Sequence, residues 1–503
     1  MLRPRLLHTY TRVSAMLDRA AFQPSTTSRL AAATRHFSAM PVELTVAGTA
    51  SNDGENTNAS IQLRRDDAIA RGVGVMTQVY ASRAENAEIW DVEGSRYIDF
   101  GSGIAVVNTG HCHPRIVEAV SDQLKSFTHT CHQVVPYENY VRLAERLNKL
   151  VPGDFPKKTI FVTTGAEAVE NAVKMARAHT KRDAVIAFGG GFHGRTFMGM
   201  SLTGKVMPYK AGFGPLLSDV YHVPFPVELH GTSVETTKHA IEQLFKYTIQ
   251  PSRVAAIILE PIQGEGGFYQ APAELMQYIR QLCDENGSVM IADEVQTGFA
   301  RTGKLLAMEH YSSHDDGSMG VTPDLTAMAK GLAGGLPLAA VTGNSDILDA
   351  ADIGGLGGTY AGSPLGIAAA HAVLDVIDDE NLCERANVLG NKLKSRLESI
   401  RLEVPNIVDI RGPGLMVAVE FGQPGGIGID DENKPGSFTP DAEFTKRVKE
   451  EALKRGLILL TCGVHSNVIR FLPPLTIPED HFEEALDIIH ASIVAIAEGH
   501  SYG

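Results

Sequence analysis

The sequence predicts an α/β protein in which strands alternate with helices and one large domain is accompanied by a smaller one. Apolar runs of strand length at 184–188 and 254–259, and the run from 289 that ends in Asp293, indicate buried strands. A chain of 503 residues is long enough for two hydrophobic cores. Open α/β sheets bind ligands at the carboxyl ends of their strands, so we expect the functional residues there.

Composition narrows the class of protein. Apolar residues make up 44% and charged residues 21% of the chain, which is ordinary for a globular enzyme, and no apolar run is long enough to cross a membrane. The net charge of −14 argues against a nucleic-acid partner. Five scattered cysteines form no C-x-x-C pair, so we expect neither a disulfide framework nor a metal site.

The first residues differ from the rest of the chain. Residues 1–37 carry arginines at 3, 5, 12, 19, 29 and 35 against the single acid Asp18. This composition is typical of a mitochondrial transit peptide, and it predicts a protein of the mitochondrial matrix. Residues 38–60 follow as a polar linker.

The N-terminal part of the folded chain begins with a predicted hairpin. One strand lies around Ile89–Asp91, a turn falls at Glu93-Gly94, and the second strand runs from Arg96 to Phe100. We assign residues 61–105 to the small domain and 106–378 to the large domain.

A strand, a turn of small residues and a helix follow one another near residue 165. The strand covers 159–162, the turn is Thr163-Thr164-Gly165-Ala166-Glu167, and the helix covers 168–179. The free amides and the positive dipole end of such a helix suit a phosphate group.

Two glycine-rich stretches admit nucleotide-binding interpretations. Gly189, Gly191 and Gly194 satisfy G-x-G-x-x-G, but the expected helix is interrupted by glycines and no acid follows at the required distance. The stretch 298–305 nearly matches a P-loop, yet Leu305 lacks the hydroxyl that binds magnesium. Phe192 instead offers a flat face to an aromatic ring, and Arg195 can bind a carboxylate.

A single lysine stands among small and apolar residues at 326–337. Lys330 has glycines on its C-terminal side, and no acid precedes or follows it closely. One interpretation is a lysine whose stem covers apolar surface while its amine reaches water. The other is an amine with a lowered pKa that reacts with a carbonyl group. Asp293 at a nearby strand end favours the second interpretation, because pyridoxal phosphate requires a lysine amine and a partner for its ring nitrogen.

The last part of the chain reads as a second domain. Helices and strands alternate over 379–503, which we assign to the small domain. Arg470 lies inside the apolar strand 468–472, where a guanidinium is costly unless it meets an anion. Glu265, on a glycine-rich loop after the strand 254–259, is a candidate partner.

Taken together, these motifs resemble the class III pyridoxal-phosphate-dependent aminotransferases, and within them the bacterial type that acts on 4-aminobutyrate. The resemblance runs from about Leu63 to the C-terminus. The motifs that carry it are Thr163–Glu170, Phe192–Arg195, Glu260–Gly267, Asp293–Gln296, Lys330 and Gly357–Tyr360. It implies a fold type I structure, with a mainly parallel seven-stranded sheet flanked by helices and a smaller α+β domain built from both ends of the chain.

The resemblance also implies a role for each residue of the cofactor site. Lys330 would hold the pyridoxal phosphate and then shuttle a proton, while Asp293 would keep the ring nitrogen protonated. The remaining cofactor-binding residues would be Gly165, Ala166, Phe192, His193, Gln296 and Thr359. Thr359 would come from a partner subunit, which implies a homodimer or a tetramer. Ala166 stands where many relatives have serine.

The implied reaction converts 4-aminobutyrate and 2-oxoglutarate to succinate semialdehyde and L-glutamate. Arg195 would bind the carboxylate that both amino donors share, and Arg470 the α-carboxylate of glutamate alone, with Glu265 pairing to Arg470 in its absence. Further substrate-binding residues would be Ile104, Gln133 and Glu260. His132 replaces an aromatic residue of the family. Alternatives are an aminotransferase for 5-aminovalerate, ornithine or β-alanine, a catalytically idle pyridoxal-phosphate-binding protein, and a nucleotide enzyme.

Overall fold

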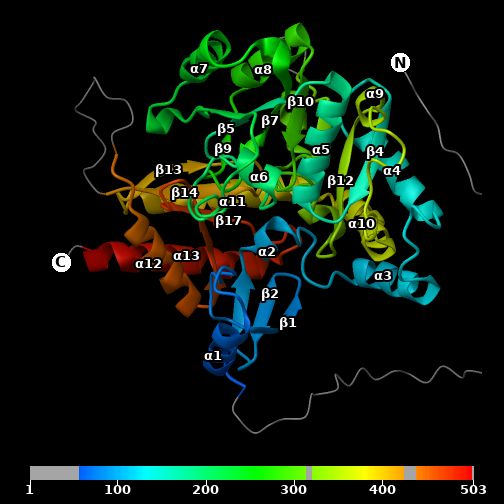
Figure 1. Ribbon diagram of the computed structural model, residues 1–503. Coiled ribbons are helices and arrows are strands. Elements are labelled where there is room, and N and C mark those ends of the chain that lie inside the picture. The colour runs from blue at the N-terminus through cyan, green and yellow to red at the C-terminus, as the bar shows by residue number, and fades with distance from the viewer. Residues whose placement is uncertain (1–55, 313–319, 424–437, 501–503) are drawn as a thin grey trace, which may run out of the picture. The chain divides into compact units, whose positions relative to one another are not determined.

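The structure is a computed structural model that describes residues 56–312, 320–423 and 438–500 (Figure 1). The described residues belong to one compact unit. The predicted transit peptide and most of the predicted linker lie outside the described residues. In the described part, no helix combines the length and the apolar character needed to cross a membrane.

A seven-stranded sheet forms the centre of this unit. Its strand order is β4-β12-β11-β10-β7-β5-β6, and β12 alone runs antiparallel to its neighbours. The mainly parallel seven-stranded sheet of the sequence prediction is therefore confirmed. The strands are β4 (Lys157–Val162), β5 (Ala184–Phe188), β6 (Val220–Val223), β7 (Val254–Leu259), β10 (Val289–Asp293), β11 (Leu325–Met328) and β12 (Ala339–Asn344).

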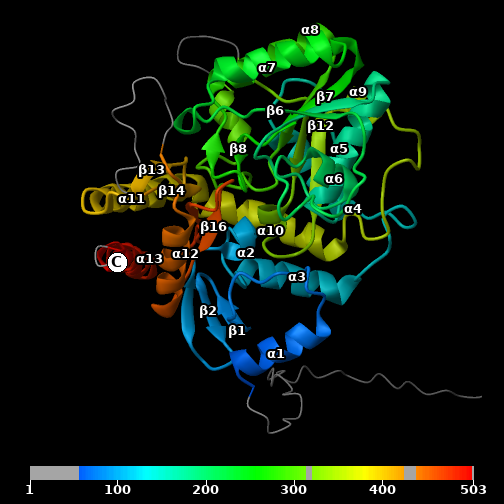
Figure 2. The ribbon, with the colours of Figure 1, turned by 60° about the vertical axis from the view of Figure 1, so that its left-hand side comes forward.

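Helices cover both faces of this sheet, which explains why its strands are apolar throughout. In β10, Val289 and Ile291 point into the core beneath α5, whereas Met290 and Ala292 point into the core beneath α7 and α8. The helices α7 and α8 lie side by side along one face (Figure 2). The flanking helices are α5 (Gly165–Thr180), α6 (Phe197–Leu202), α7 (Val234–Tyr247), α8 (Ala273–Asn286) and α9 (Ser345–Leu348).

A further layer of helices contacts the β4 edge of the sheet and the segment that follows β11. The helix α10 contacts both α3 and α4, and also the short helix η4 (Lys330–Ala333). These helices are α3 (Pro114–Ser126), α4 (Glu138–Leu150) and α10 (Pro364–Asp379). The residue Lys330 is thus supported from one side by the sheet and from the other by α10.

The chain also forms two smaller sheets, and both of its ends contribute to the first of them. The first has the order β1-β2-β3-β15, so a C-terminal strand pairs with the predicted N-terminal hairpin. The second has the order β13-β14-β17-β16. Their strands are β1 (Ala81–Glu85), β2 (Glu88–Asp91), β3 (Arg96–Asp99), β13 (Ile407–Arg411), β14 (Val417–Phe421), β15 (Leu457–Ile458), β16 (Leu460–Cys462) and β17 (Val468–Phe471).

The remaining elements complete this region. A two-stranded hairpin of β8 (Ile262–Gln263) and β9 (Tyr269–Gln270) follows β7, and its loop carries Glu265. The helices are α1 (Asn58–Ala68), α2 (Ser102–Ala105), α11 (Leu382–Arg401), α12 (Ala442–Lys454) and α13 (Glu479–His500), and the short 3-10 helices are η1 (Glu228–His230), η2 (Pro251–Arg253) and η3 (Ala307–Tyr311).

Two details differ from the sequence prediction. The helix α6 forms despite Gly199. A Cβ at this position would lie about 3 Å from the backbone of residues 193–194, so the absence of a side chain lets the helix pack closely there. The helix α1 begins at Asn58, inside the predicted linker, and Thr57 caps it through a reciprocal pair of hydrogen bonds with Ser60.

Candidate active site

A pocket of about 500 Å³ opens where the carboxyl ends of the parallel strands meet. Loops after five strands line it: β4, β5, β7, β10 and β11. Of the predicted site residues, the lining includes Gly165, Ala166, Phe192, His193, Arg195, Glu260, Asp293, Gln296 and Lys330. Residues separated by more than 160 positions in the sequence therefore share one cavity at the edge where an open α/β sheet binds ligands.

The N-terminus of α5 forms one end of the pocket. Thr164 and Glu167 make a capping box, in which the Thr164 side chain accepts from the Glu167 amide and the Glu167 carboxylate accepts from the Thr164 amide. In the part of the chain that the structure describes, this cap does not use the amides of Gly165 and Ala166. A Cβ at Gly165 would lie 2.7 Å from the Val295 side chain, so the close approach of these loops requires glycine there.

Lys330 lies directly after β11 at the bottom of the pocket. Its backbone is left-handed, with φ of 45°, a conformation that non-glycine residues adopt at a cost and that is often found at functional sites. Desolvation lowers the pKa of Lys330 to about 8, although the nearby Glu265 carboxylate opposes this change. A larger fraction of the ε-amine than in an ordinary lysine is therefore uncharged near neutral pH and able to react with a carbonyl group.

Asp293 at the end of β10 forms a buried pair with His193. Oδ2 of Asp293 lies 2.8 Å from Nδ1 of His193, and Oδ1 accepts the amide of Val295 at 3.1 Å. Burial lowers the pKa of His193, but its hydrogen bond to Asp293 and the charge of that carboxylate outweigh burial and raise the pKa above its usual value. Both contacts fix the carboxylate beside the pocket.

Two buried polar atoms of the pocket lack a hydrogen-bond partner within the described residues. They are Oε1 of Gln296 and Nε2 of His193. Buried polar atoms are normally paired, so each indicates a group that the pocket receives from outside. A hydroxyl on a flat ring matches the Gln296 oxygen, and Phe192 lies beside it as an aromatic wall.

Glu260, predicted as a substrate-binding residue, lines the pocket and also makes contacts within the protein. It is buried, and its two oxygens accept the amides of Phe192 at 2.8 Å and Gly264 at 2.9 Å. Burial raises the pKa of Glu260 above its usual value. The side chain lines the pocket, and at the same time it braces the two loops that carry Phe192 and Glu265.

The two arginines face different surroundings. Arg195 is exposed at the pocket mouth, with its guanidinium 5.9 Å from the Phe192 ring and 4.8 Å from the Tyr209 ring. Arg470 on β17 is fully buried, and its Nη1 lies 2.5 Å from Oε1 of Glu265. Within the described residues, Nε and Nη2 of Arg470 have no hydrogen-bond partner.

The Arg470–Glu265 pair perturbs both groups. Burial alone would raise the pKa of Glu265, but the charge and hydrogen bond of Arg470 bring it below its usual value. Burial alone would lower the pKa of Arg470, but the charge and hydrogen bond of Glu265 bring it above its usual value. The two groups are therefore an ion pair at neutral pH, in which Arg470 is buried and Glu265 is partly exposed.

Five predicted site residues lie outside the pocket lining: Glu265 and Arg470, described above, and Ile104, Gln133 and Thr359. Ile104 is half-buried in the kinked helix α2, with φ of 68°. Gln133 is exposed and donates to the carbonyl of Leu356 at 3.0 Å. Thr359 is exposed on the loop between α9 and α10.

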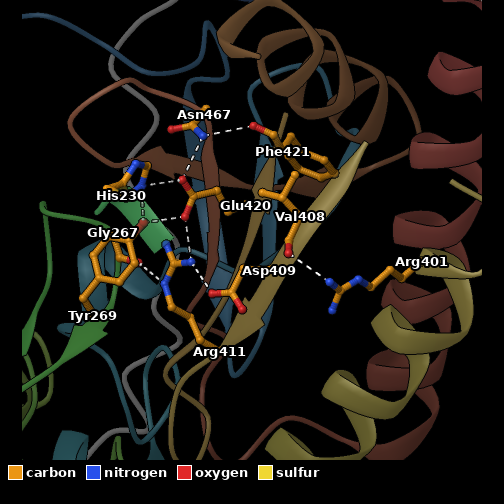
Figure 3. A network of polar contacts seen from close by, with 10 residues as sticks. All are labelled: His230, Gly267, Tyr269, Arg401, Val408, Asp409, Arg411, Glu420, Phe421 and Asn467. Carbon is orange, nitrogen blue, oxygen red and sulfur yellow. Dashed lines mark hydrogen bonds and ion pairs between the residues drawn. The ribbon is translucent and has the colours of Figure 1, made fainter. Parts of the chain in front are cut away.

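A network of polar contacts, missed by the sequence prediction, fixes the hairpin that carries Glu265 (Figure 3). Glu420 on β14 is fully buried and receives the Tyr269 hydroxyl at 2.5 Å, Nη1 of Arg411 at 2.7 Å and Nδ2 of Asn467 at 3.0 Å. Nε2 of His230 lies 3.0 Å from the same carboxylate. The hairpin strand β9 is thereby joined to the β13–β14–β17 sheet.

The comparison with known protein families identifies the class of protein. The model of the family "Aminotransferase class-III" matches residues 68–493. The chain therefore belongs to the class III aminotransferases, which are enzymes that depend on pyridoxal phosphate.

Individual relatives extend over most of the chain. It is 51% identical to the 4-aminobutyrate aminotransferase of Escherichia coli over 86% of this chain and 98% of that protein. It is 50% identical to the 5-aminovalerate aminotransferase of Pseudomonas putida over 88% of this chain and 99% of that protein. Among solved structures, a transaminase from the marine bacterium Virgibacillus is 25% identical with a TM-score of 0.78, covering 88% of this chain and 99% of that one.

The predicted location in the mitochondrial matrix is wrong. The curated relatives at 42–51% identity are proteins of bacteria, which have no mitochondria. The same finding argues against a mitochondrial transit peptide in residues 1–37, which lie outside the family match and outside the described residues. An arginine-rich, acid-poor segment can direct import only in a cell that has mitochondria. The composition of residues 1–37 is therefore not sufficient to predict a mitochondrial location.

Proposed function

We propose that the chain transfers the amino group of 4-aminobutyrate to 2-oxoglutarate, giving succinate semialdehyde and L-glutamate. The observation that carries the proposal is the pair of guanidinium sites, one open at the pocket mouth and one buried and neutralised by an internal carboxylate. Relatives named 4-aminobutyrate aminotransferases at 42–51% identity support it.

Charge explains how one pocket takes both amino donors. Arg195 binds the carboxylate that 4-aminobutyrate and glutamate share. Glutamate brings a second carboxylate, for which Glu265 must leave Arg470; with 4-aminobutyrate, Glu265 stays and keeps the buried guanidinium paired. The pairing matters because a buried charge that loses its partner costs roughly 3–5 kcal/mol.

The residues of the pocket fit pyridoxal phosphate. The free amides of Gly165 and Ala166 suit its phosphate, Asp293 its protonated ring nitrogen, and Oε1 of Gln296 its ring hydroxyl. When bound, the cofactor supplies a conjugated ring that accepts electrons from the substrate carbon. The amine of Lys330 would hold the cofactor and would carry the proton to and from the carbon that bears the amino group.

Product analysis tests the proposed reaction. Purified protein supplied with pyridoxal phosphate, 4-aminobutyrate and 2-oxoglutarate is expected to form succinate semialdehyde and L-glutamate in equal amounts. Formation of neither product, with cofactor bound, would contradict the proposal.

The second candidate substrate is 5-aminovalerate. Relatives named 5-aminovalerate aminotransferases are 50–51% identical to this chain, as close as those named for 4-aminobutyrate. The two substrates differ by one methylene between amine and carboxylate, which is worth roughly 1–3 kcal/mol in a pocket of fixed length. The ratio of their kcat/KM values with 2-oxoglutarate decides between them.

Replacing Glu265 by glutamine tests how the pocket discriminates between 4-aminobutyrate and glutamate. The amide cannot neutralise Arg470, so the α-carboxylate of glutamate no longer competes with a charged partner. We expect Glu265→Gln to shift the ratio of kcat/KM for 4-aminobutyrate over glutamate toward glutamate by roughly 10²-fold. Glu398→Gln on the exposed face of α11 is the matched control. An unchanged ratio in Glu265→Gln would show that the pair plays no part in substrate choice.

The functional unit is proposed to be a homodimer, alone or within a tetramer, in which Thr359 reaches the phosphate of the partner subunit. Thr359 is exposed and absent from the pocket of its own chain, and the exposed apolar residues Ile353 and Tyr360 lie on the same loop. The predicted ligands Ile104 and Gln133 keep their proposed substrate-binding roles in this assembly. The proposed division into a large domain, 106–378, and a small domain, 61–105 with 379–503, is supported by the pairing of β3 with β15.

Mixing of two inactive or impaired variants tests the shared site. Loss of one hydrogen bond to phosphate in Thr359→Ala should weaken pyridoxal phosphate binding roughly tenfold. A dimer of one Thr359→Ala chain and one Lys330→Ala chain has one site with an intact lysine and an intact threonine from the partner. Titration of the mixture with pyridoxal phosphate should therefore show a set of sites that bind the cofactor with wild-type affinity. If Thr359 acts within its own chain, mixing restores nothing.

A further inference from the structure

Tyr209 contacts both of the proposed carboxylate-binding sites, the Arg470–Glu265 pair and Arg195. Its hydroxyl lies 3.1 Å from Oε2 of Glu265, and its ring lies 4.8 Å from the guanidinium of Arg195. The ring also packs against Phe192, with centroids 4.9 Å apart. Only 8% of Tyr209 is exposed, so this position is fixed by packing on several sides.

Glu265 is consequently held by both of its oxygens. Oε1 pairs with Arg470, and Oε2 accepts the hydroxyl proton of Tyr209. In the proposed function a second carboxylate binds Arg470 in place of Glu265, and the side-chain movement that this replacement requires breaks both contacts together. Hydrogen bonds to a charged acceptor are about twice as strong as neutral ones, so the second contact adds substantially to the cost of the movement.

The backbone around Glu265 cannot easily move in place of the side chain. Its carbonyl accepts the amide of Gly463 at 3.1 Å, and the carbonyl of Gly267 accepts Nε of Arg411 at 2.8 Å. The Glu420 network holds the next strand of the hairpin, β9, at Tyr269 (Figure 3). The rearrangement that admits a dicarboxylate is therefore confined to the Glu265 side chain and its two contacts.

We propose that Tyr209 is a specificity-determining positioning residue, whose hydroxyl holds Glu265 on Arg470 and so disfavours substrates with a second carboxylate. Tyr209 acts through Glu265 and sets the balance between ω-amino acids with one carboxylate and α-amino acids with two. The inference rests on the proposed function, because it assumes that Arg470 receives the α-carboxylate of glutamate.

The variant Tyr209→Phe keeps the ring over Arg195 and removes only the hydroxyl. The ratio of kcat/KM for glutamate over 4-aminobutyrate should rise roughly tenfold, chiefly through a lower KM for glutamate. In the Glu265→Gln background the same substitution should leave that ratio unchanged, because the carboxylate it acts on is absent. Tyr278→Phe on α8 is the matched control, since the Tyr278 ring also faces a cation, Lys238, at 5.6 Å.

An equilibrium measurement separates this role from a general effect on the fold. Butyrate and glutarate do not react, and they carry one and two carboxylates. Their dissociation constants from the cofactor-loaded protein should change unequally in Tyr209→Phe, with glutarate gaining roughly tenfold relative to butyrate. Equal changes for the two ligands, or an effect of Tyr209→Phe that persists in the Glu265→Gln background, would overturn the inference.

Failure of the inference and failure of the proposed function give different results. If the wild-type protein forms no succinate semialdehyde from 4-aminobutyrate, the proposed function fails. If the wild-type protein forms it and the Tyr209→Phe ratios equal those of the wild type, the inference about Tyr209 alone is overturned.

Discussion

Replacement of Lys330 by alanine is expected to lower the rate of transamination at least about 10⁴-fold, the upper range for loss of a positioned proton carrier. The reason is that Lys330 has the one amine that lines the pocket within the described residues, and desolvation lowers its pKa to about 8. The measurement is the single-turnover formation of succinate semialdehyde by protein loaded with pyridoxal phosphate. Lys304→Ala, in the glycine-rich stretch that resembles a P-loop, is the matched control and should retain wild-type rates.

A small external amine distinguishes loss of the proton carrier from damage to the fold. Methylamine added to Lys330→Ala should restore part of the rate in proportion to its uncharged fraction, because it fits the space that the side chain vacates. Lys330→Ala activity within tenfold of the wild type would contradict the assignment of this residue.

Asp293→Asn is expected to lower the rate roughly 10²–10³-fold, as estimated from the 3–5 kcal/mol lost when one partner of a buried charged pair is removed. The amide cannot hold the ring nitrogen of the cofactor in its protonated form, and it leaves His193 beside a neutral group. The same half-reaction measures the effect. Asp349→Asn is the control, because Asp349 makes an exposed contact with Lys158 at the protein surface. A loss smaller than tenfold in Asp293→Asn would mean that the carboxylate does not face the ring nitrogen.

Much of the central sheet was predictable from the sequence because its strands are buried on both faces. The strand limits 184–188 and 254–259 agree with the structure, since continuous apolar runs bounded by polar turns leave little choice of register. The direction of β12 was not predictable. Its buried sequence at 339–343 satisfies burial equally well in either direction, and only the connection from Lys330 through η4 brings it back antiparallel to β11.

The candidate site was predictable where a residue with suitable chemistry lies at the end of a strand. Asp293 ends one strand, Lys330 and the turn before α5 come just after two others, and the parallel arrangement brings them to one edge. Arg470 was noticeable for another reason, as a cation inside an apolar strand.

Other contacts could not be predicted from patterns in the sequence. Tyr209 lies in a loop of lysine, proline and glycine residues, 56 positions from the carboxylate that it contacts. The partners Tyr269 and Glu420 are 151 positions apart, and each looks like an ordinary residue of its own strand. Such pairings depend on how two sheets pack together, which local patterns do not encode.

The central claim is that the amine of Lys330 carries the cofactor in the pocket at the strand ends, and borohydride reduction followed by peptide mapping tests it most directly. Reduction converts the reversible bond between a protein amine and the cofactor aldehyde into a permanent one. The account predicts that the added mass lies on the peptide containing Lys330 and disappears when 4-aminobutyrate is present before reduction. Mass added to another lysine, or to none in protein that has bound the cofactor, would contradict it.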